Sequence, residues 1–262
     1  MNIETRRRII QHLSSVMERI IERRCVTEPF DPNEILLANP FGFRLVPIEV
    51  WKGAKFERSF VTTLGQGIFE QLAKIIAEGT GAVAENQHDT HLRINTWRLE
   101  KIDEILKSQR ESRRAPNWEQ EVAEILALNN ERYEEVIVKS DLYIRRPDGS
   151  QEFYSFKTVK PNLDQTERAK RDMLRLLAGD VNNKAYFALP FNPAGEGNPY
   201  REAGFTIPYK LLNMDQDECV LIGAELWNRI GNDVNTYDEL LELFEQVGEE
   251  YSPIIRREYF GI

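Results

Sequence analysis

Two neighbouring segments of this chain carry the side-chain pattern of a β-hairpin, and this pattern constrains the fold more than any other feature. Residues 136–144 (VIVKSDLYI) and 151–159 (QEFYSFKTV) are rich in β-branched and aromatic residues, which favour strands. Residues 146–149 (RPDG) lie between them and are turn formers. The sequence therefore predicts two adjacent antiparallel strands.

Helical periodicity flanks this hairpin on both sides. Apolar residues recur every three or four positions in segments that predict helices over residues 4–24, 65–79, 98–110, 117–129 and 163–178. Capping boxes are predicted at Asn117 with Gln120, at Asp164 with Glu167, and at Thr236 with Glu239, which opens the last helix.

Further strands are predicted in residues 184–191 (KAYFALPF) and 218–227 (ECVLIGAELW), whereas the four prolines of residues 29–47 predict an irregular stretch. Because helices and strands alternate, we expect an α/β fold. We expect one domain over residues 1–262, with a helical arm in 1–55 and a catalytic core in 56–262.

Composition excludes some classes of protein and leaves others open. With 41% apolar residues the chain can form a core, its apolar runs are too short to cross a bilayer, and its N-terminus lacks a secretory signal. Two cysteines without CxxC spacing predict reduced thiols, so we expect a cytoplasmic protein without a membrane partner. The net charge of -9 disfavours nucleic acid, but basic residues cluster in 110–114 and 157–175.

The hairpin also brings together residues that suit phosphodiester hydrolysis. Side chains alternate along a strand, so Phe153, Ser155 and Lys157 share one face, and Asp141 lies on the neighbouring strand. A carboxylate can hold Mg²⁺ against a phosphate while a lysine orients or deprotonates the attacking water. A solvated strand pair with charged edges is the alternative interpretation.

Residues 140–177 (SDLYIRRPDGSQEFYSFKTVKPNLDQTERAKRDMLRLL) resemble the active-site core of PD-(D/E)xK restriction endonucleases, and most closely the TdeIII-type family, which recognises GGNCC. Residues 60–79 and 218–248 support the likeness, which spans about residues 55–250. The resemblance implies a restriction-endonuclease-like α/β core, in which helices flank a central mixed sheet and helical elaborations are added.

The same resemblance implies a type II restriction endonuclease of a prokaryotic restriction-modification system. It implies Mg²⁺-dependent cleavage of double-stranded DNA to 5′-phosphate ends, a homodimer that matches a palindromic target, and a DNA methyltransferase as genetic partner. Carried onto this sequence, Asp141 matches the metal-binding aspartate and Lys157 the catalytic lysine.

Ser155 departs from the family pattern, because an acid is expected there and a hydroxyl binds Mg²⁺ poorly. Glu70, on the predicted helix 65–79, matches a helical glutamate that faces the metal in many members, and we expect it to supply the missing carboxylate. Glu167 is an alternative that its predicted capping box can explain, and Glu152 ranks last because it lies on the opposite strand face.

DNA contacts are predicted beyond the hairpin. Lys160, Asn162 and Gln165 match family positions at a helix start that suits phosphate contact, although a polar helix cap explains them equally well. Arg201, within the Gly- and Pro-rich residues 192–210, is a candidate for guanine edges, and an ordinary surface loop is the alternative.

One further motif and two alternative functions remain to be considered. Residues 88–91 (HDTH) lack the spacing of a zinc site and are interpreted as a loop. Two rival functions stay open: a structure-specific repair nuclease of the same fold, and a DNA-binding module that has lost catalysis at Ser155.

Overall fold

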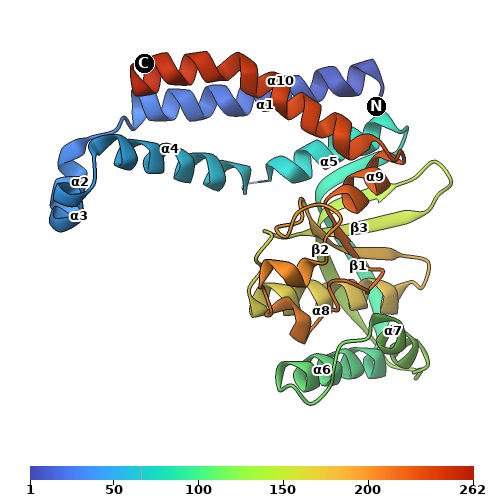
Figure 1. Ribbon diagram of the computed structural model, residues 1–262. Coiled ribbons are helices and arrows are strands. Elements are labelled where there is room, and N and C mark those ends of the chain that lie inside the picture. Colours follow the sequence, from blue (N-terminus) through green and yellow to red (C-terminus); the bar gives the residue numbers. More distant parts are fainter. Residues whose placement is uncertain (66) are drawn as a thin grey trace. The chain divides into compact units, whose positions relative to one another are not determined.

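A computed structural model describes residues 1–65 and 67–262 of the chain. The chain forms two compact units, one from residues 1–72 and 238–262 and the other from residues 73–237. Helix α5 (Ile68–Gly79) crosses from the first unit to the second at Leu72. Figure 1 labels helices α1 to α10 and strands β1 to β3.

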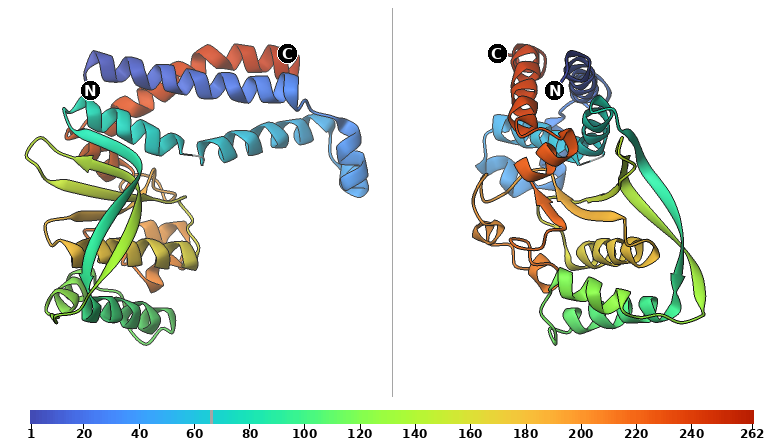
Figure 2. Two further views of the ribbon diagram at one scale, coloured as in Figure 1. Left: turned by 180° about the vertical axis from the view of Figure 1, so that it is seen from behind. Right: turned by 90° about the vertical axis from the view of Figure 1, so that its right-hand side faces the viewer.

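The first unit is helical. Its elements are α1 (Ile3–Glu22), η1 (Arg23–Thr27), α2 (Pro32–Ala38), α3 (Pro40–Leu45), α4 (Ile48–Leu64), the start of α5, nearly all of α10 (Thr236–Ile254), and η4 (Ile255–Phe260). Helix α10 runs parallel to α1, as Figures 1 and 2 show. Glu239 binds the amino group of Met1 at 2.9 Å, and the Tyr251 hydroxyl donates to Glu18 at 3.1 Å.

The predicted irregular stretch around the prolines is wrong. Pro32 and Pro40 each occupy the first turn of a short helix, where a missing N–H costs nothing. The side chains of Asp31 and Asn39 accept hydrogen bonds from the N–H groups of residues 33 and 42 and cap these helices. Prolines therefore start helices here rather than prevent them.

The second unit is built on a five-stranded mixed sheet in the order β1-β2-β3-β4-β5. Its strands are β1 (Val83–Asn95), β2 (Tyr133–Arg145), β3 (Gln151–Phe156), β4 (Lys184–Leu189) and β5 (Val220–Ile222). The first three strands are antiparallel neighbours, and β4 and β5 run parallel to β3. The helices of this unit are α6 (Thr96–Arg110), α7 (Trp118–Leu126), α8 (Leu163–Gly179) and α9 (Ala224–Gly231), with short 3₁₀ turns η2 (Tyr200–Ala203) and η3 (Pro208–Lys210).

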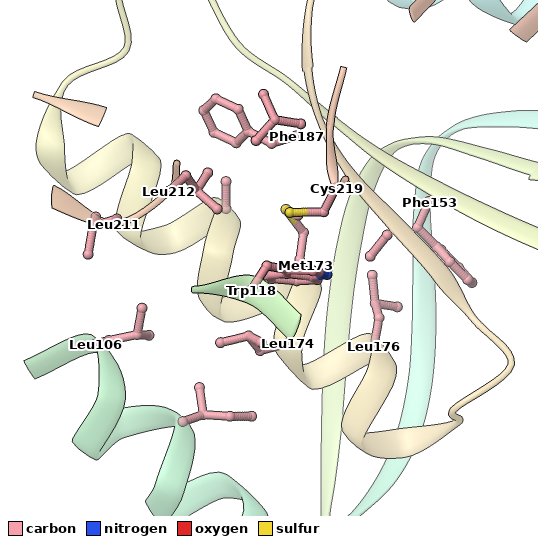
Figure 3. Close-up of a cluster of buried hydrophobic side chains, with 14 of the residues drawn as sticks. Leu106, Trp118, Phe153, Met173, Leu174, Leu176, Phe187, Leu211, Leu212 and Cys219 are labelled. Atoms are coloured by element: carbon pink, nitrogen blue, oxygen red, sulfur yellow. The ribbon is translucent and has the colours of Figure 1, made fainter. Parts of the chain in front are cut away.

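Helices cover both faces of this sheet. Helix α8 packs on β1, β2 and β4, and α6 and α7 pack against α8. Phe153 of β3 and Met173 of α8 belong to this core, which Figure 3 shows together with Trp118 and Phe187. On the other face, where the alternate side chains of β3 point, Glu152 binds Arg229 of α9 at 3.0 Å.

A fully buried ion pair crosses the helical layer. The ammonium of Lys170 lies 2.5 Å from the Glu121 carboxylate and donates to the side-chain amide oxygen of Gln109 at 3.0 Å, and all three residues are fully buried. The three residues come from α8, α7 and α6. Burial lowers the pKa of Lys170, although the Glu121 carboxylate raises it. The pair therefore ties three helices together at the cost of two desolvated charges.

The structure confirms the α/β class, with a mixed sheet between helices. The hairpin of β2 and β3, its turn at residues 146–149, and α8 lie where the sequence predicts them. Two predictions are wrong: residues 88–91 belong to β1 rather than to a loop, and residues 224–227 belong to α9 rather than to a strand.

The capping boxes are partly wrong as well. Helix α8 is capped by Asn162 and Gln165, not by Asp164 and Glu167. Asn117 does accept from the N–H of Gln120, but the side chain that returns to the Asn117 N–H is that of Glu121. The side chain of Glu239, predicted to form a capping box with Thr236, binds Met1 and Arg6.

Among the described residues, no helix combines the length and the apolar character that a bilayer span requires.

Candidate active site

The hairpin places the predicted acid and lysine side by side. Asp141 lies in β2 and Lys157 directly follows β3, and the Lys157 ammonium is 3.2 Å from Oδ2 of Asp141. Ser155 lies between them, with its hydroxyl 2.7 Å from the ammonium and 3.5 Å from the same carboxylate oxygen. Asp141, Ser155 and Lys157 are thus on one face of the sheet, within hydrogen-bonding reach of one another.

Three oxygen atoms surround the Lys157 ammonium. Besides Asp141 Oδ2 and Ser155 Oγ, the ammonium donates to the backbone carbonyl of Phe156 at 2.8 Å. The side chains of Asp141 and Lys157 are 25% and 19% exposed, so both are largely buried and still accessible to solvent. A carboxylate with a hydroxyl and a carbonyl oxygen close by, open to solvent, offers the oxygen ligands that a hard cation uses.

These oxygens fit a magnesium site in which water completes the coordination. Mg²⁺ uses one or two carboxylates and keeps several waters, and the chain offers one carboxylate with a carbonyl and a hydroxyl beside it. Within the described residues, no three histidine, cysteine, aspartate or glutamate side chains form a ready-made metal cluster. A metal held here therefore depends on a carbonyl, on water or on another acid.

The structure adds Gln87 to the site, a residue that the sequence reasoning missed. Gln87 lies in β1, and its side-chain amide donates to Oδ1 of Asp141 at 3.4 Å. The two oxygens of the Asp141 carboxylate thus have different partners, Gln87 on one side and Lys157 with Ser155 on the other. The sequence predicts no strand over residues 83–95 and interprets residues 88–91 as a loop, so it gives no reason to expect Gln87 beside β2.

Several acids can be considered as a second carboxylate. Glu70 is half-buried on α5 and belongs to the first unit. Glu167 is engaged by two arginines, Arg110 at 2.6 Å and Arg171 at 3.0 Å. The structural role of Glu167 is therefore to pair with these arginines rather than to form a capping box, and this role needs no part in catalysis.

Glu152 and Asp172 have different surroundings. Glu152 is buried on the α9 side of the sheet, where Arg146 and Arg229 bind it. Asp172, on α8, was not considered from sequence. Burial raises the pKa of Asp172, against the lowering effect of positive charges that include Lys157. Asp172 is therefore a carboxylate that lies within the electrostatic field of the site.

The residues predicted to contact DNA have definite structural roles. The side chain of Asn162 accepts from the N–H of Gln165, and the side chain of Gln165 accepts from the N–H of Asn162, so both cap α8. The Lys160 ammonium lies 4.2 Å from the centre of the Phe205 ring, and Arg201 binds Asp215 at 2.6 Å. The partners of Lys160 and Arg201, which are Phe205 and Asp215, thus both lie in residues 192–217, the segment that follows β4.

Much of the basic clustering is neutralised. Arg110 binds Asp164 as well as Glu167, and Arg114 binds Glu124 at 2.8 Å. Arg171 pairs with Asp103 in addition to Glu167. The basic sequence clusters near residues 110–114 and 157–175 therefore do not translate directly into free positive surface.

Comparison with known proteins decides the family. A family model described as "Type II restriction endonuclease, HinfI" matches residues 5–248 of this chain. The chain belongs to the HinfI family. As a HinfI-family member it is a type II restriction endonuclease, which is a site-specific deoxyribonuclease.

Curated relatives agree with this assignment over nearly the whole chain. Type II restriction enzymes HgiCII and HgiEI of Herpetosiphon aurantiacus are each 30% identical to it, over 262 and 261 residues, with 93% of both chains covered. HgiBI of the same organism is 31% identical over 216 residues, which cover 80% of this chain and 77% of the relative. HinfI-family enzymes act on DNA and as a class use a divalent metal.

Proposed function

We propose that this HinfI-family enzyme hydrolyses double-stranded DNA with Mg²⁺ at the site formed by Asp141, Ser155 and Lys157, leaving 5′-phosphate ends. The observation that carries the proposal is the convergence of the Asp141 carboxylate, the Ser155 hydroxyl and the Phe156 carbonyl on the Lys157 ammonium. The same set combines oxygen ligands for a cation with a proton-donating group that can contact water and phosphate.

Each side chain has a distinct task in this proposal. The carboxylate of Asp141 and the carbonyl of Phe156 would hold the metal, which when bound supplies a Lewis acid and an activated water. The ammonium of Lys157 orients the attacking water and offers positive charge to the phosphate oxygens as negative charge grows on them. Ser155 is the third member of the catalytic set, and its 2.7 Å hydrogen bond holds the Lys157 amine in place.

The second carboxylate is proposed to come from Glu70. The support is the match of its helix to the family position, together with the partial burial of Glu70. Glu167 is the weaker candidate because two arginines already neutralise it.

We propose GGNCC as the target, from the resemblance to the TdeIII-type family. Lys160, Asn162 and Gln165 would contact phosphates at the start of α8, where backbone N–H groups and the helix dipole favour anions. Arg201 would read guanine edges. For Arg201 this requires that the guanidinium, 61% exposed, exchange or share its contact with Asp215.

A homodimer is proposed as the active form, with one site for each DNA strand. The support comes from α2 and α3, which bury none of their side chains. Leu37, Phe41 and Leu45 on these helices are 83%, 82% and 83% exposed. Short helices gain most of their stability from packing of their apolar side chains, and we propose that a second copy of the chain packs on these three.

The dimer is tested by replacing these three side chains together. We expect the L37Q/F41Q/L45Q variant to be a monomer by light scattering after gel filtration and to lose double-strand cleavage. Retention of the dimer by that variant would exclude this surface.

The biological setting follows from the enzyme class. We propose a restriction-modification system in a prokaryotic cytoplasm, with a DNA methyltransferase that protects the same target on host DNA. Incubation of the purified protein with plasmid and Mg²⁺ is expected to give a fixed fragment ladder, which Lys157→Ala abolishes and prior methylation by the partner prevents. Random nicking would favour a repair nuclease, and metal-independent binding without cleavage would favour a DNA-binding module.

A further inference from the structure

Gln87 has an unusual backbone for a residue inside a strand. Its φ is +54°, in the left-handed region that side chains other than glycine rarely adopt. Among the described non-glycine residues, only Ser112 and Asn232 share a positive φ, and both lie just past the ends of helices, where this conformation is common. Gln87 alone has it within a strand.

The distortion is located opposite Asp141. The pairing of β1 with β2 runs in one register along both strands, with Asn86 facing Leu142 and His88 facing Ser140. In that register Gln87 faces Asp141, and within these two described strands this is the one position where pairing lapses. No residue is inserted, so the lapse is a local departure from strand geometry and not a β-bulge.

Side chains connect the two strands at the position where the pairing lapses. Gln87 Nε2 donates to Asp141 Oδ1 at 3.4 Å, while Oδ2 faces Lys157 and Ser155. The carboxylate is therefore held from two neighbouring strands, by an amide on one side and by an ammonium and a hydroxyl on the other. This fixes the rotation of the carboxylate about its Cβ–Cγ bond.

The chemistry of an amide suits this position. An amide N–H can orient a carboxylate without neutralising it, so the negative charge stays available to a cation, whereas a lysine or arginine at residue 87 would compete with the cation. Strained backbone conformations persist where surrounding structure enforces them, and they cluster at functional sites. Here the strain lies at the residue that faces the metal-binding aspartate of the proposed site.

We propose that Gln87 is a positioning residue, which orients the Asp141 carboxylate for the divalent metal through its side-chain amide and its left-handed backbone. This inference rests on the proposed function of the Asp141 site. Loss of an orienting partner of a metal-binding group typically lowers metal affinity or activity by about 10- to 100-fold. We expect an effect of that size on metal affinity and a smaller effect on DNA affinity.

Two substitutions separate the side chain from the backbone. Gln87→Ala removes the amide and keeps a β-carbon at positive φ, whereas Gln87→Gly removes the amide and relieves the strain. Asp89→Asn is the matched control, because Asp89 lies two residues further along β1 and makes an exposed 3.7 Å pair with Lys139. Asp141→Ala serves as the reference for a destroyed site.

The readout is the binding of Mn²⁺ to the full-length protein with DNA present, followed by electron paramagnetic resonance, together with the Mg²⁺ dependence of single-turnover cleavage. We expect both Gln87 variants to bind Mn²⁺ about 10-fold or more weakly, to need correspondingly more Mg²⁺ for cleavage, and to melt as cooperatively as Asp89→Asn. The Asp89→Asn protein is expected to match the wild type.

Three different results would contradict the inference. If Asp141→Ala and Lys157→Ala destroy cleavage while both Gln87 variants bind Mn²⁺ and cleave like the wild type, Gln87 has no positioning role but the proposed function survives. If Asp141→Ala itself cleaves normally, the proposed site is wrong and the inference falls with it. Normal Mn²⁺ binding by Gln87→Gly alone would assign the role to the backbone and contradict a role for the amide.

Discussion

The Lys157 ammonium lies 3.2 Å from the Asp141 carboxylate, although the two residues are separated by 16 positions and a tight turn. The turn at residues 146–149 sets the register of β2 and β3, in which Tyr143 faces Phe153 and Leu142 faces Tyr154. Continued by one residue on each strand beyond Leu142 and Tyr154, that register puts Asp141 and Ser155 beside each other, with Lys157 next on the same face. A one-residue slip would move Lys157 to the α9 side of the sheet and separate the pair.

Ser155 is expected to matter through Lys157. Ser155→Ala removes the 2.7 Å partner of the ammonium but leaves its contacts to Asp141 and Phe156. We expect the cleavage rate at saturating Mg²⁺ to fall about 10-fold, the low end for loss of an orienting partner. Ser150→Ala, in the hairpin turn, is the control because its hydroxyl donates to Asp148 and belongs to the turn rather than to the site. An unchanged rate in Ser155→Ala would show that the amine needs no such support.

The source of the second carboxylate can be assigned by three matched amides. We expect Glu70→Gln to lose cleavage by about 100-fold or more, as a missing metal ligand should. Glu167→Gln should cleave within a few-fold of the wild type, because its carboxylate serves Arg110 and Arg171. Single-turnover assays at several Mg²⁺ concentrations measure all three. A severe loss in Asp172→Asn with an active Glu70→Gln would move the second carboxylate to α8.

Asp172 also predicts a pH dependence of stability. Burial raises its folded-state pKa above the ordinary value of 3.8, so the folded protein holds this proton more tightly than the unfolded chain. The contribution of the group to stability is thus greatest below that value and is lost as the pH rises through the folded pKa. We expect Asp172→Asn to melt at a higher temperature than the wild type at pH 7, and the difference to shrink as the pH falls toward 4. A less stable variant at pH 7 would show that its arginine partners outweigh burial.

The buried pair of Lys170 and Glu121 predicts non-additive stability. Lys170→Met leaves the Glu121 carboxylate buried and unpaired, and we expect it to lower the free energy of unfolding by about 3–5 kcal/mol. Adding Glu121→Leu to that variant should recover much of the loss, because the charge that was left alone is then removed. Denaturant titrations of the two single variants and the double variant measure this coupling. Losses that simply add in the double variant would contradict an energetic coupling between Lys170 and Glu121.

Much of the site could be predicted because its determinants are local in sequence. The hairpin follows from alternating β-branched and aromatic residues and a turn whose Gly149 has φ +87°. Helix α8 begins after Asn162, as a capping residue dictates, even though the predicted box was placed two residues too late. The convergence of Asp141, Ser155 and Lys157 needs only strand alternation and that turn.

The failures have equally physical causes. Residues 85–91 of β1 alternate between exposed and half-buried side chains, and all seven are polar. They therefore lack the alternation of apolar and polar residues that predicts a strand. The apolar residues of 218–227 predict one continuous strand. Gly223, with φ +56°, instead separates β5 from α9. The conformation of Gln87 arises from its packing against β2, so no local sequence rule could predict it.

The joint action of Asp141 and Lys157 is tested most directly by a double-mutant cycle on cleavage. Asp141→Asn, Lys157→Met and the double variant are compared with the wild type in single-turnover cleavage of a duplex that carries the target, at saturating Mg²⁺. We expect each single variant to lose at least about 100-fold in rate, and the double variant to lose little more than the worse single one, because residues that act as a unit are not additive. Single variants that cleave within a few-fold of the wild type, or losses that multiply in the double variant, would contradict a shared site.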